Sequence, residues 1–448
     1  MKKKLNVGFI TTVSGRWPRE LPNQRLAAYG AWLEQKLMDV NLMRFDTVID
    51  STERIEQAID TLKRQDVDLV ILLYGAFTGD DVCTAIADRL RVPLVLWAPH
   101  EPDLGGGRLL ANALVALTMN SASLHRLGHP SYPIYGDKEE PAVESRLLSL
   151  VDAHRVVKEM RYTLLGLFGY RPTAFYNSAF DEGLIRRTFG VRLEETDLKV
   201  VFDRMQALEA QAVDSDKALV AGSYRLLDSL PAEHYDNHTR LYLALKELVA
   251  EQGYDFSVIK CWPEMGNLKT TPCAVLGRLA DQGVHIGCEG DVDAALAMVA
   301  QNYITGLPCF ITDMIDMDQQ QNSLTFWHCG NAAPSLHDDK YDGLMGNHPL
   351  AGQGTAFHTT LRQGPVTIAR FCNIGGVYKL FLLRGEAIPT QLYTPGCMVK
   401  VQIDAPVQEV LYGMMEKGVP HHYSIVWADV ADTMRQVARL LNLEIIEY

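Results

Sequence analysis

The chain has 448 residues, of which 47% are hydrophobic, and its formal net charge is −13 at pH 7. So negative a chain is a poor partner for the phosphates of nucleic acid, and we exclude that class of ligand. No run of about 18 apolar residues occurs, which excludes a membrane-spanning helix, and the length is typical of about three domains.

The first third of the chain alternates between continuous apolar runs and helical spacing. The elements expected here are strands at 5–13, 67–75 and 92–101 and helices at 25–40 and 79–90. Continuous apolar runs are typical of strands buried on both faces, and their alternation with helices indicates a parallel sheet covered on both sides. We therefore predict an α/β domain over residues 1–158.

A second α/β domain is predicted over residues 159–313. After an initial strand and turn, a long stretch with helical composition extends to about residue 253. The block then ends with a short apolar run, a helix at about 291–304 and a strand that ends at Asp313.

The sequence pattern changes after about residue 320, where short strand-like runs are separated by Gly, Pro and Asn. This pattern predicts an antiparallel sheet or barrel, so residues 314–448 are expected to form a β-rich C-terminal domain. The fold class is thus α/β, with two Rossmann-like domains followed by a barrel-like one.

The eight cysteines include no C-x-x-C pair, and several lie in apolar runs such as "PCFITD". In a chain of this length we interpret them as reduced and buried, which indicates a cytoplasmic protein.

Three residues form a candidate metal site. Glu289 precedes a predicted helix in "GCEGD", Asp313 follows an apolar strand in "CFITD", and His422 is the second histidine of "GVPHH". Two carboxylates and an imidazole suit Mn²⁺ or Mg²⁺ better than structural zinc. Each residue also has a purely structural explanation. The negative charge of Glu289 would interact favourably with the dipole of the helix that follows it. Asp313 would belong to a solvated acidic loop, and a lone histidine is usually structural.

Polar and aromatic residues near these motifs are candidates for binding a polyhydroxylated ligand. Arg16, between Gly15 and Trp17, lies at the carboxyl end of the first predicted strand, where α/β domains build sites. For Trp262, core packing is as reasonable as stacking on a sugar. The full set of substrate-binding candidates is Arg16, Trp17, Lys260, Trp262, His328, Asn331 and His421.

The motifs "GCEGD", "ITD", "WHCGN" and "GVPHH", in that order, resemble those of the L-fucose isomerase and L-arabinose isomerase superfamily. The resemblance covers essentially the whole chain, and "SGRWPRE" resembles the substrate-contacting turn after the first strand of fucose isomerases. It implies an aldose–ketose isomerase that uses Mn²⁺, Mg²⁺ or Co²⁺ held by Glu289, Asp313 and His422.

The resemblance also implies that Glu289 and Asp313 transfer the proton through a cis-enediol of the sugar, and that His421 contacts either the substrate or the residues that support the metal ligands. It implies a homo-oligomer, a hexamer in those families, in which the N-terminal domain of one chain caps its neighbour's site. A hydride shift would use the same metal differently and stays an alternative.

Other classes of function remain open. A sulfonated sugar such as sulfoquinovose would need a cation at the pocket, for which Arg16, Arg19, Arg171 and Lys260 are candidates. A metal-dependent aldolase or epimerase could use the same chemistry, and a non-catalytic sugar-binding protein would need no metal set.

Overall fold

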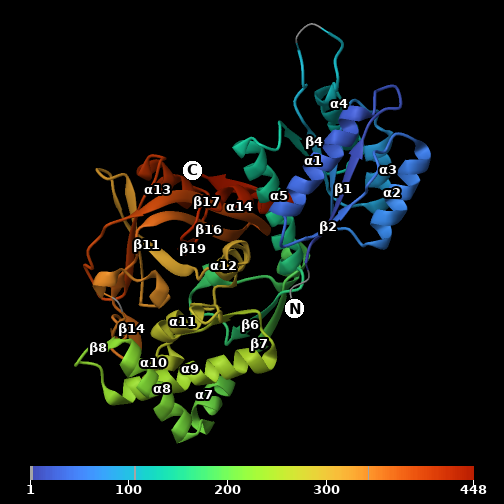
Figure 1. Ribbon diagram of the computed structural model, residues 1–448. Coiled ribbons are helices and arrows are strands. Elements are labelled where there is room, and N and C mark those ends of the chain that lie inside the picture. The colour runs from blue at the N-terminus through green and yellow to red at the C-terminus, as the bar shows by residue number, and fades with distance from the viewer. Residues whose placement is uncertain (1–3, 105–106, 342) are drawn as a thin grey trace. The chain divides into compact units, whose positions relative to one another are not determined.

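The computed structural model describes residues 4–104, 107–341 and 343–448 (Figure 1). The chain divides into two compact units, Met1–Lys158 and Glu159–Tyr448, and each is described by itself. The further boundary predicted at residue 313 falls inside the second unit and stays a prediction.

The first unit is built on a parallel sheet with the strand order β2-β1-β3-β4-β5. Its strands are β1 (Asn6–Thr12), β2 (Asn41–Arg44), β3 (Leu69–Tyr74), β4 (Leu94–Ala98) and β5 (Ser131–Tyr135). Its helices are α1 (Glu20–Lys36), α2 (Thr52–Arg64), α3 (Asp81–Leu90), α4 (Ala113–Arg126) and α5 (Pro141–Met160). Strands β3 and β4 are buried along their whole length, because helices cover both faces of the sheet (Figure 1).

The second unit begins with another parallel sheet, of order β10-β9-β6-β7. Its strands are β6 (Leu164–Phe168), β7 (Arg192–Thr196), β9 (Phe256–Ile259) and β10 (Ile286–Gly287). Its helices are α6 (Glu182–Phe189), α7 (Leu198–Ala207), α8 (Ala210–Ser223), α9 (Ala232–Gln252), α10 (Glu264–Asn267), α11 (Cys273–Ala280) and α12 (Val292–Thr305), with a short 3-10 helix at Tyr176–Ser178.

The predicted long helix before residue 253 is wrong in detail, because strand β7 interrupts it. Helix α6 ends at Gly190, whose φ of 76° takes the left-handed conformation, and the chain then pairs with β6. The edge of β6 provides backbone hydrogen bonds that outweigh the helical composition of "RLEET".

The rest of the second unit is β-rich. Strands β18, β12, β11, β19, β16 and β17 pair in this order, and β17 pairs again with β18, which closes a barrel. The strands are β11 (Phe310–Asp318), β12 (Ser323–His328), β15 (Thr359–Thr360), β16 (Gly364–Ile374), β17 (Val377–Ile388), β18 (Cys397–Gln402), β19 (His422–Val426) and β20 (Glu444–Glu447). Two helices, α13 (Val407–Glu416) and α14 (Ala431–Leu440), accompany them, and β8 (Arg225–Leu226), β13 (Leu344–Asn347) and β14 (Thr355–Phe357) form a small separate sheet.

Helix α12 joins the two parts of this unit. It packs against β9 and β10 of the parallel sheet and against β11, β16 and β19 of the barrel, and it is buried from Val292 to Tyr303. Gln301 donates to the carbonyl oxygens of Thr367 and Ser424, which ties the middle of the helix to two barrel strands. The amino end of α12 is therefore held against both sheets.

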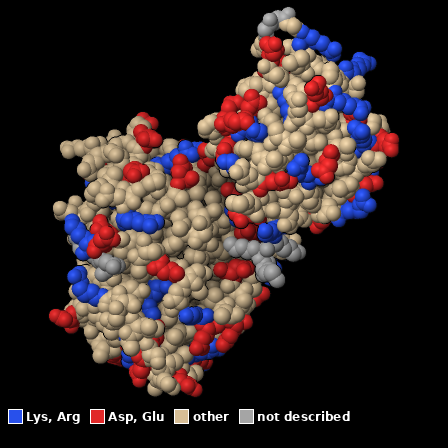
Figure 2. Space-filling model, viewed as in Figure 1, with Lys and Arg blue, Asp and Glu red and all other residues tan. Residues whose placement is uncertain are grey.

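These features confirm the predicted fold class of parallel α/β domains followed by an antiparallel β-rich domain. All eight cysteines are free. Within the described ranges, no helix combines the length and apolarity needed to cross a membrane. On the face shown in Figure 2, acidic and basic side chains are interspersed.

Candidate metal and substrate site

Two of the candidate ligands project from neighbouring barrel strands. Asp313 on β11 and His422 on β19 stand directly opposite each other in the antiparallel register. Directly opposite residues project from the same face of a sheet, so the two side chains meet. The sequence predicted that β11 ends at Asp313; instead the strand continues to Asp318, and Asp313 lies within it.

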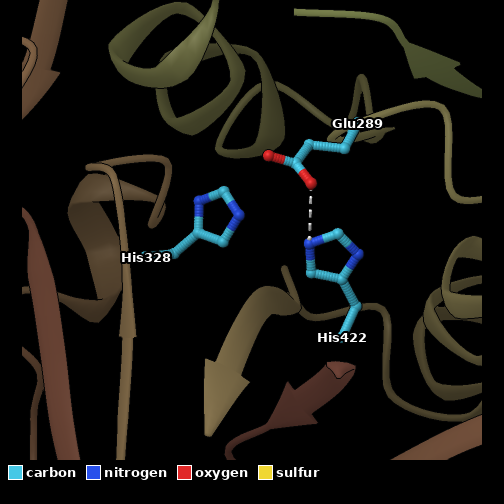
Figure 3. A group of neighbouring side chains, drawn as sticks. All are labelled: Glu289, His328 and His422. Atoms are coloured by element: carbon cyan, nitrogen blue, oxygen red, sulfur yellow. Dashed lines mark ion pairs between the residues drawn. The ribbon is translucent and has the colours of Figure 1, made fainter. Parts of the chain in front are cut away.

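Glu289 reaches the same place from a tight turn between β10 and α12. Glu289 and Gly290 both have left-handed φ angles, of 56° and 61°. A Cβ atom added at Gly290 would lie 2.0 Å from the carbonyl oxygen of Tyr170, so only glycine fits there. This turn directs the Glu289 carboxylate toward the His422 ring, and His328 lies beside both residues (Figure 3).

The three groups converge without a normal hydrogen bond between them. Nε2 of His422 lies 3.4 Å from Glu289 Oε2 and 3.6 Å from Asp313 Oδ1. Nε2 of His421 lies 3.9 Å from the same two oxygens. These separations leave room for an ion or a proton between the groups.

A buried ion pair behind the site fixes the His422 ring. Nδ1 of His422 lies 2.9 Å from Asp291 Oδ2, and the Arg370 guanidinium binds both oxygens of that carboxylate at 2.9 and 3.0 Å. Because the ion-paired Asp291 can only accept, Nδ1 of His422 carries the hydrogen and Nε2 of the neutral ring presents a lone pair.

The electrostatics are those of a site that attracts a positive charge. Burial alone would lower the pKa of His422, but its hydrogen bond to Asp291 and the carboxylates of Asp313 and Glu289 raise that pKa overall. Burial alone would raise the pKa of Glu289, but contact with His421 and the other nearby histidines lowers it. Glu289 is therefore ionised at neutral pH, and a proton on His422 Nε2 would compete with a metal ion.

The donor set fits a divalent cation. Asp313 Oδ1, His422 Nε2 and His328 Nδ1 are buried polar atoms that have no hydrogen-bond partner among the described residues. Two groups, Glu289 with His328 and His422 and Asp313 with His421 and His422, each bring their ligand atoms within 4.8 Å of one another. Carboxylate oxygens with imidazole nitrogens are ligands that suit Mn²⁺ and neighbouring metals.

A pocket of about 260 Å³ opens beside Glu289. Its lining residues are Cys261, Trp262, Gly266, Thr271, Pro272, Cys273, Cys288, Glu289, His328, Cys329, His348, Leu350 and Ala351. Trp262 Nε1 donates to Glu289 Oε1 at 3.3 Å, so this tryptophan belongs to the site and not to the core. Among the residues that the structure describes, the lining includes no lysine or arginine.

The other predicted substrate residues lie in different surroundings. His421 is partly exposed and pairs through Nδ1 with Asn177 at 2.6 Å. Asn331 donates to the Ile311 carbonyl, and its Oδ1 is buried without a partner. Lys260 forms an ion pair of 2.5 Å with Glu264, which engages its charge.

Arg16 and Trp17 belong to the first unit. They line a cavity of about 680 Å³ there, between the loops that follow β1 and β3. This is the point where the strand order of the sheet reverses, where open α/β sheets bind ligands.

Sequence reasoning missed Asp291, Arg370 and His348. Asp291 was part of the quoted "GCEGD" motif, but its role depends on a residue that lies 79 positions away. Arg370 did give a signal, because a single arginine inside the apolar run "VTIARF" must find a buried partner.

Comparison with known proteins identifies the class. A sulfoquinovose isomerase from Alkalicoccus urumqiensis is 30% identical over 386 residues, 85% of this chain and 86% of that protein. Those from Priestia aryabhattai and Clostridium sp. (strain MSTE9) are 27% and 29% identical, over 89% and 84% of this chain and 90% and 85% of those proteins. No protein-family model matches.

These relatives show that the protein is an aldose–ketose isomerase of sugars, which is an intramolecular oxidoreductase. The chain belongs to the same family as these sulfoquinovose isomerases. The sequence prediction of a sugar isomerase is confirmed at this level.

Proposed function

We propose that this protein interconverts a sulfonated aldose, sulfoquinovose, and the corresponding ketose with the help of a divalent cation. The observation that carries the proposal is the convergence of Glu289, Asp313 and His422 in a chain whose named relatives are all sulfoquinovose isomerases. Membership of the wider L-fucose and L-arabinose isomerase superfamily is part of the same proposal.

Glu289, Asp313 and His422 would hold the cation, for which we propose Mn²⁺, with Mg²⁺ or Co²⁺ as substitutes. His328 is a further candidate ligand, because its Nδ1 is buried without a partner next to Glu289 and His422. A bound divalent cation supplies Lewis-acid polarisation of neighbouring substrate oxygens.

The chain's own carboxylates would move the proton. Isomerisation removes a proton from C2 of the aldose and returns one to C1, through the enediol of the sugar, while a second proton leaves O2 and one is added to O1. Glu289 Oε2 and Asp313 Oδ1 lie 3.4 and 3.6 Å from His422 Nε2, so one carboxylate can act as base and the other as acid.

Arg171 is the best candidate for binding the sulfonate. Of the four cations considered, Arg19 is paired with Asp50 and Lys260 with Glu264, and Arg16 belongs to the first unit. Arg171 has no carboxylate partner within the described ranges, and its guanidinium stacks on Tyr170 and Tyr176 at 5.4 Å from each ring. Its backbone passes beside Gly290, next to Glu289.

One observation favours a second candidate, a neutral aldose. The pocket beside Glu289 is lined by Trp262 and four cysteines and contains no cation, which suits an uncharged sugar. The two substrates are separated by comparing sulfoquinovose with its deoxy analogue quinovose.

We also propose a cytoplasmic homo-oligomer, a hexamer, in which Arg16 and Trp17 of one copy complete the site of another. Light scattering at the assay concentration should show that the active protein is larger than a monomer. Loss of kcat with retained Mn²⁺ binding in Arg16→Ala would support this arrangement, and an active monomer would refute it.

The decisive experiment follows the reaction by NMR in D₂O, after chelation and after addition of Mn²⁺. We expect conversion of sulfoquinovose only with metal, and deuterium from solvent on C1 of the ketose. Conversion of quinovose alone would favour the neutral substrate, and conversion without deuterium over many turnovers would favour a hydride shift. Activity unaffected by chelation would refute the metal site.

A further inference from the structure

His348 lies in the loop between β13 and β14 and lines the pocket beside Glu289 and His328. Its ring is held by its own loop, because Nδ1 accepts hydrogen bonds from the backbone N–H groups of Leu350 at 3.2 Å and Ala351 at 3.0 Å. The loop therefore fixes both the position of the ring and the chemistry of its nitrogens.

Two N–H groups directed at one ring nitrogen decide the tautomer. Nδ1 must present its lone pair to them, so the hydrogen of the neutral imidazole sits on Nε2. Burial, together with nearby His328 and His358, lowers the pKa of His348 to about 4, so the ring is neutral at pH 7. No hydrogen bond engages Nε2 within the described part of the chain.

His422 shows the opposite arrangement. Its Nδ1 donates to the ion-paired Asp291 carboxylate, so its Nε2 offers a lone pair to a metal ion. His348 would lose both backbone hydrogen bonds if its ring reversed these roles. His348 lines the pocket that Glu289 also lines, and His422 Nε2 lies 3.4 Å from Glu289, so one histidine near this carboxylate offers an acceptor and the other a donor.

Two other donors of the pocket lining are already engaged. Trp262 Nε1 donates to Glu289, and the Thr271 hydroxyl donates to the Thr355 carbonyl oxygen at 3.0 Å. The thiols of Cys273 and Cys288 are weak donors, and burial raises the pKa of Cys273 well above its usual value. A sugar in this pocket presents hydroxyl, carbonyl or sulfonate oxygens, all of which accept.

We infer that the Nε2–H group of His348 donates a hydrogen bond to an oxygen of the bound sugar, and that His348 contacts the substrate but does not ligate the metal. The inference rests on the proposed function for the identity of the ligand. The tautomer and the metal content test it independently of catalysis.

Two substitutions separate the role of the loop from the role of the donor. In His348→Asn the side-chain oxygen can replace Nδ1 as the acceptor for the loop, but the donor at Nε2 is lost. In His348→Gln the amide can replace the donor, but the loop loses its acceptor. His358→Gln is the control, because His358 Nδ1 also accepts from a backbone N–H group, that of Gly396, but His358 does not line the pocket.

We expect His348→Asn to lower kcat/KM by about 10-fold to 100-fold, the usual effect of losing one donor to a substrate. Mn²⁺ content and the urea midpoint should stay at wild-type values, and His348→Gln should retain more activity but unfold earlier. Among substrates that each lack one oxygen, the effect should vanish for the one that lacks the contacted oxygen. Unchanged kinetics in His348→Asn, or loss of Mn²⁺, would overturn the inference.

Imidazole ¹⁵N NMR of the metal-free protein gives a readout that does not depend on activity. We expect His348 to show the Nε2–H tautomer from pH 6 to 8, with the Nε2 shift changing when a substrate sugar is added. A hydrogen on Nδ1 would overturn the inference even if the protein is an active isomerase. If the wild type converts no aldose, the proposed function fails, while the tautomer and metal results still decide the assignment of His348.

Discussion

Asp291→Asn should weaken both the fold and the metal site, because one carboxylate makes two kinds of contact. Asp291 is 1% exposed, forms a two-point ion pair with Arg370 at 2.9 and 3.0 Å, and holds the His422 ring through Nδ1 at 2.9 Å. In the wild type, Asp291 Oδ1 accepts a hydrogen bond from the Ala294 N–H at 3.0 Å and so caps α12. Asparagine has the same shape, and its side-chain oxygen can still accept this bond. The charge is what the substitution removes.

The two expected magnitudes come from these contacts. Arg370 is 0% exposed, and removing one partner of a buried ion pair costs about 3–5 kcal/mol of unfolding free energy. Asparagine also no longer compels Nδ1 of His422 to carry the hydrogen, and loss of such an orienting partner lowers metal affinity by about 10-fold to 100-fold.

Asp293→Asn is the matched control. Asp293 lies in the first turn of α12 and is buried, and it accepts a hydrogen bond from the Tyr378 hydroxyl at 2.7 Å. Within the described ranges, no hydrogen bond joins Asp293 to His422. Burial raises the pKa of Asp293 to about 6, so its ionisation opposes folding above that pH, and removing the charge should not weaken the fold. We expect this variant to bind Mn²⁺ with wild-type affinity.

Two measurements check these magnitudes. The metal-free protein is titrated with Mn²⁺, and the EPR signal of the free ion reports the Mn²⁺ affinity. Urea unfolding of the metal-free protein reports the unfolding free energy. Wild-type Mn²⁺ affinity in Asp291→Asn would refute the orienting role of Asp291. A loss of less than about 1 kcal/mol in unfolding free energy would refute the argument from the buried ion pair.

Three further predictions concern the turn, the pH dependence and the sulfonate. Gly290→Ala should lower the unfolding free energy by about 3 kcal/mol or more, because the new Cβ would lie 2.0 Å from the Tyr170 carbonyl oxygen. The same displacement should move Glu289 and lower kcat. Gly306→Ala is the control: its Cβ would have open space around it, so urea unfolding should show a loss of only about 1 kcal/mol. Burial lowers the pKa of His154 to about 3, so below pH 6.5 the unfolded chain binds a proton that the folded chain does not, and the unfolding free energy falls with pH. His154→Gln should remove about 1.4 kcal/mol of the unfolding free energy that the wild type loses between pH 8 and 5.5. Equal losses in the two proteins would contradict this prediction. Arg171→Gln should lower kcat/KM for sulfoquinovose by about 10-fold to 100-fold and leave quinovose unaffected, and a parallel loss for both sugars would exclude sulfonate binding.

The sequence determined the parts of the fold that depend on local burial patterns. The continuous apolar runs at β3 and β4 predicted strands covered on both faces, and the short punctuated runs after residue 320 predicted the antiparallel barrel. Strand β7 could not be predicted in this way, because its "RLEET" sequence is mostly exposed and forms a strand only at the edge that β6 offers.

The same division applies to the candidate site. The resemblance to the fucose and arabinose isomerases implied Glu289, Asp313 and His422, and the structure brings both carboxylates within 3.6 Å of His422 Nε2. The sequence could not say which nitrogen of a histidine faces the ligand. That property depends on partners far away in the sequence, such as the Asp291 carboxylate, 131 positions from His422. At His348 it depends on the path of a loop that turns two backbone N–H groups toward one ring atom. Hydrogen-bond direction is a property of atoms in space, so only the tertiary structure decides that His422 presents an acceptor to the site while His348 presents a donor.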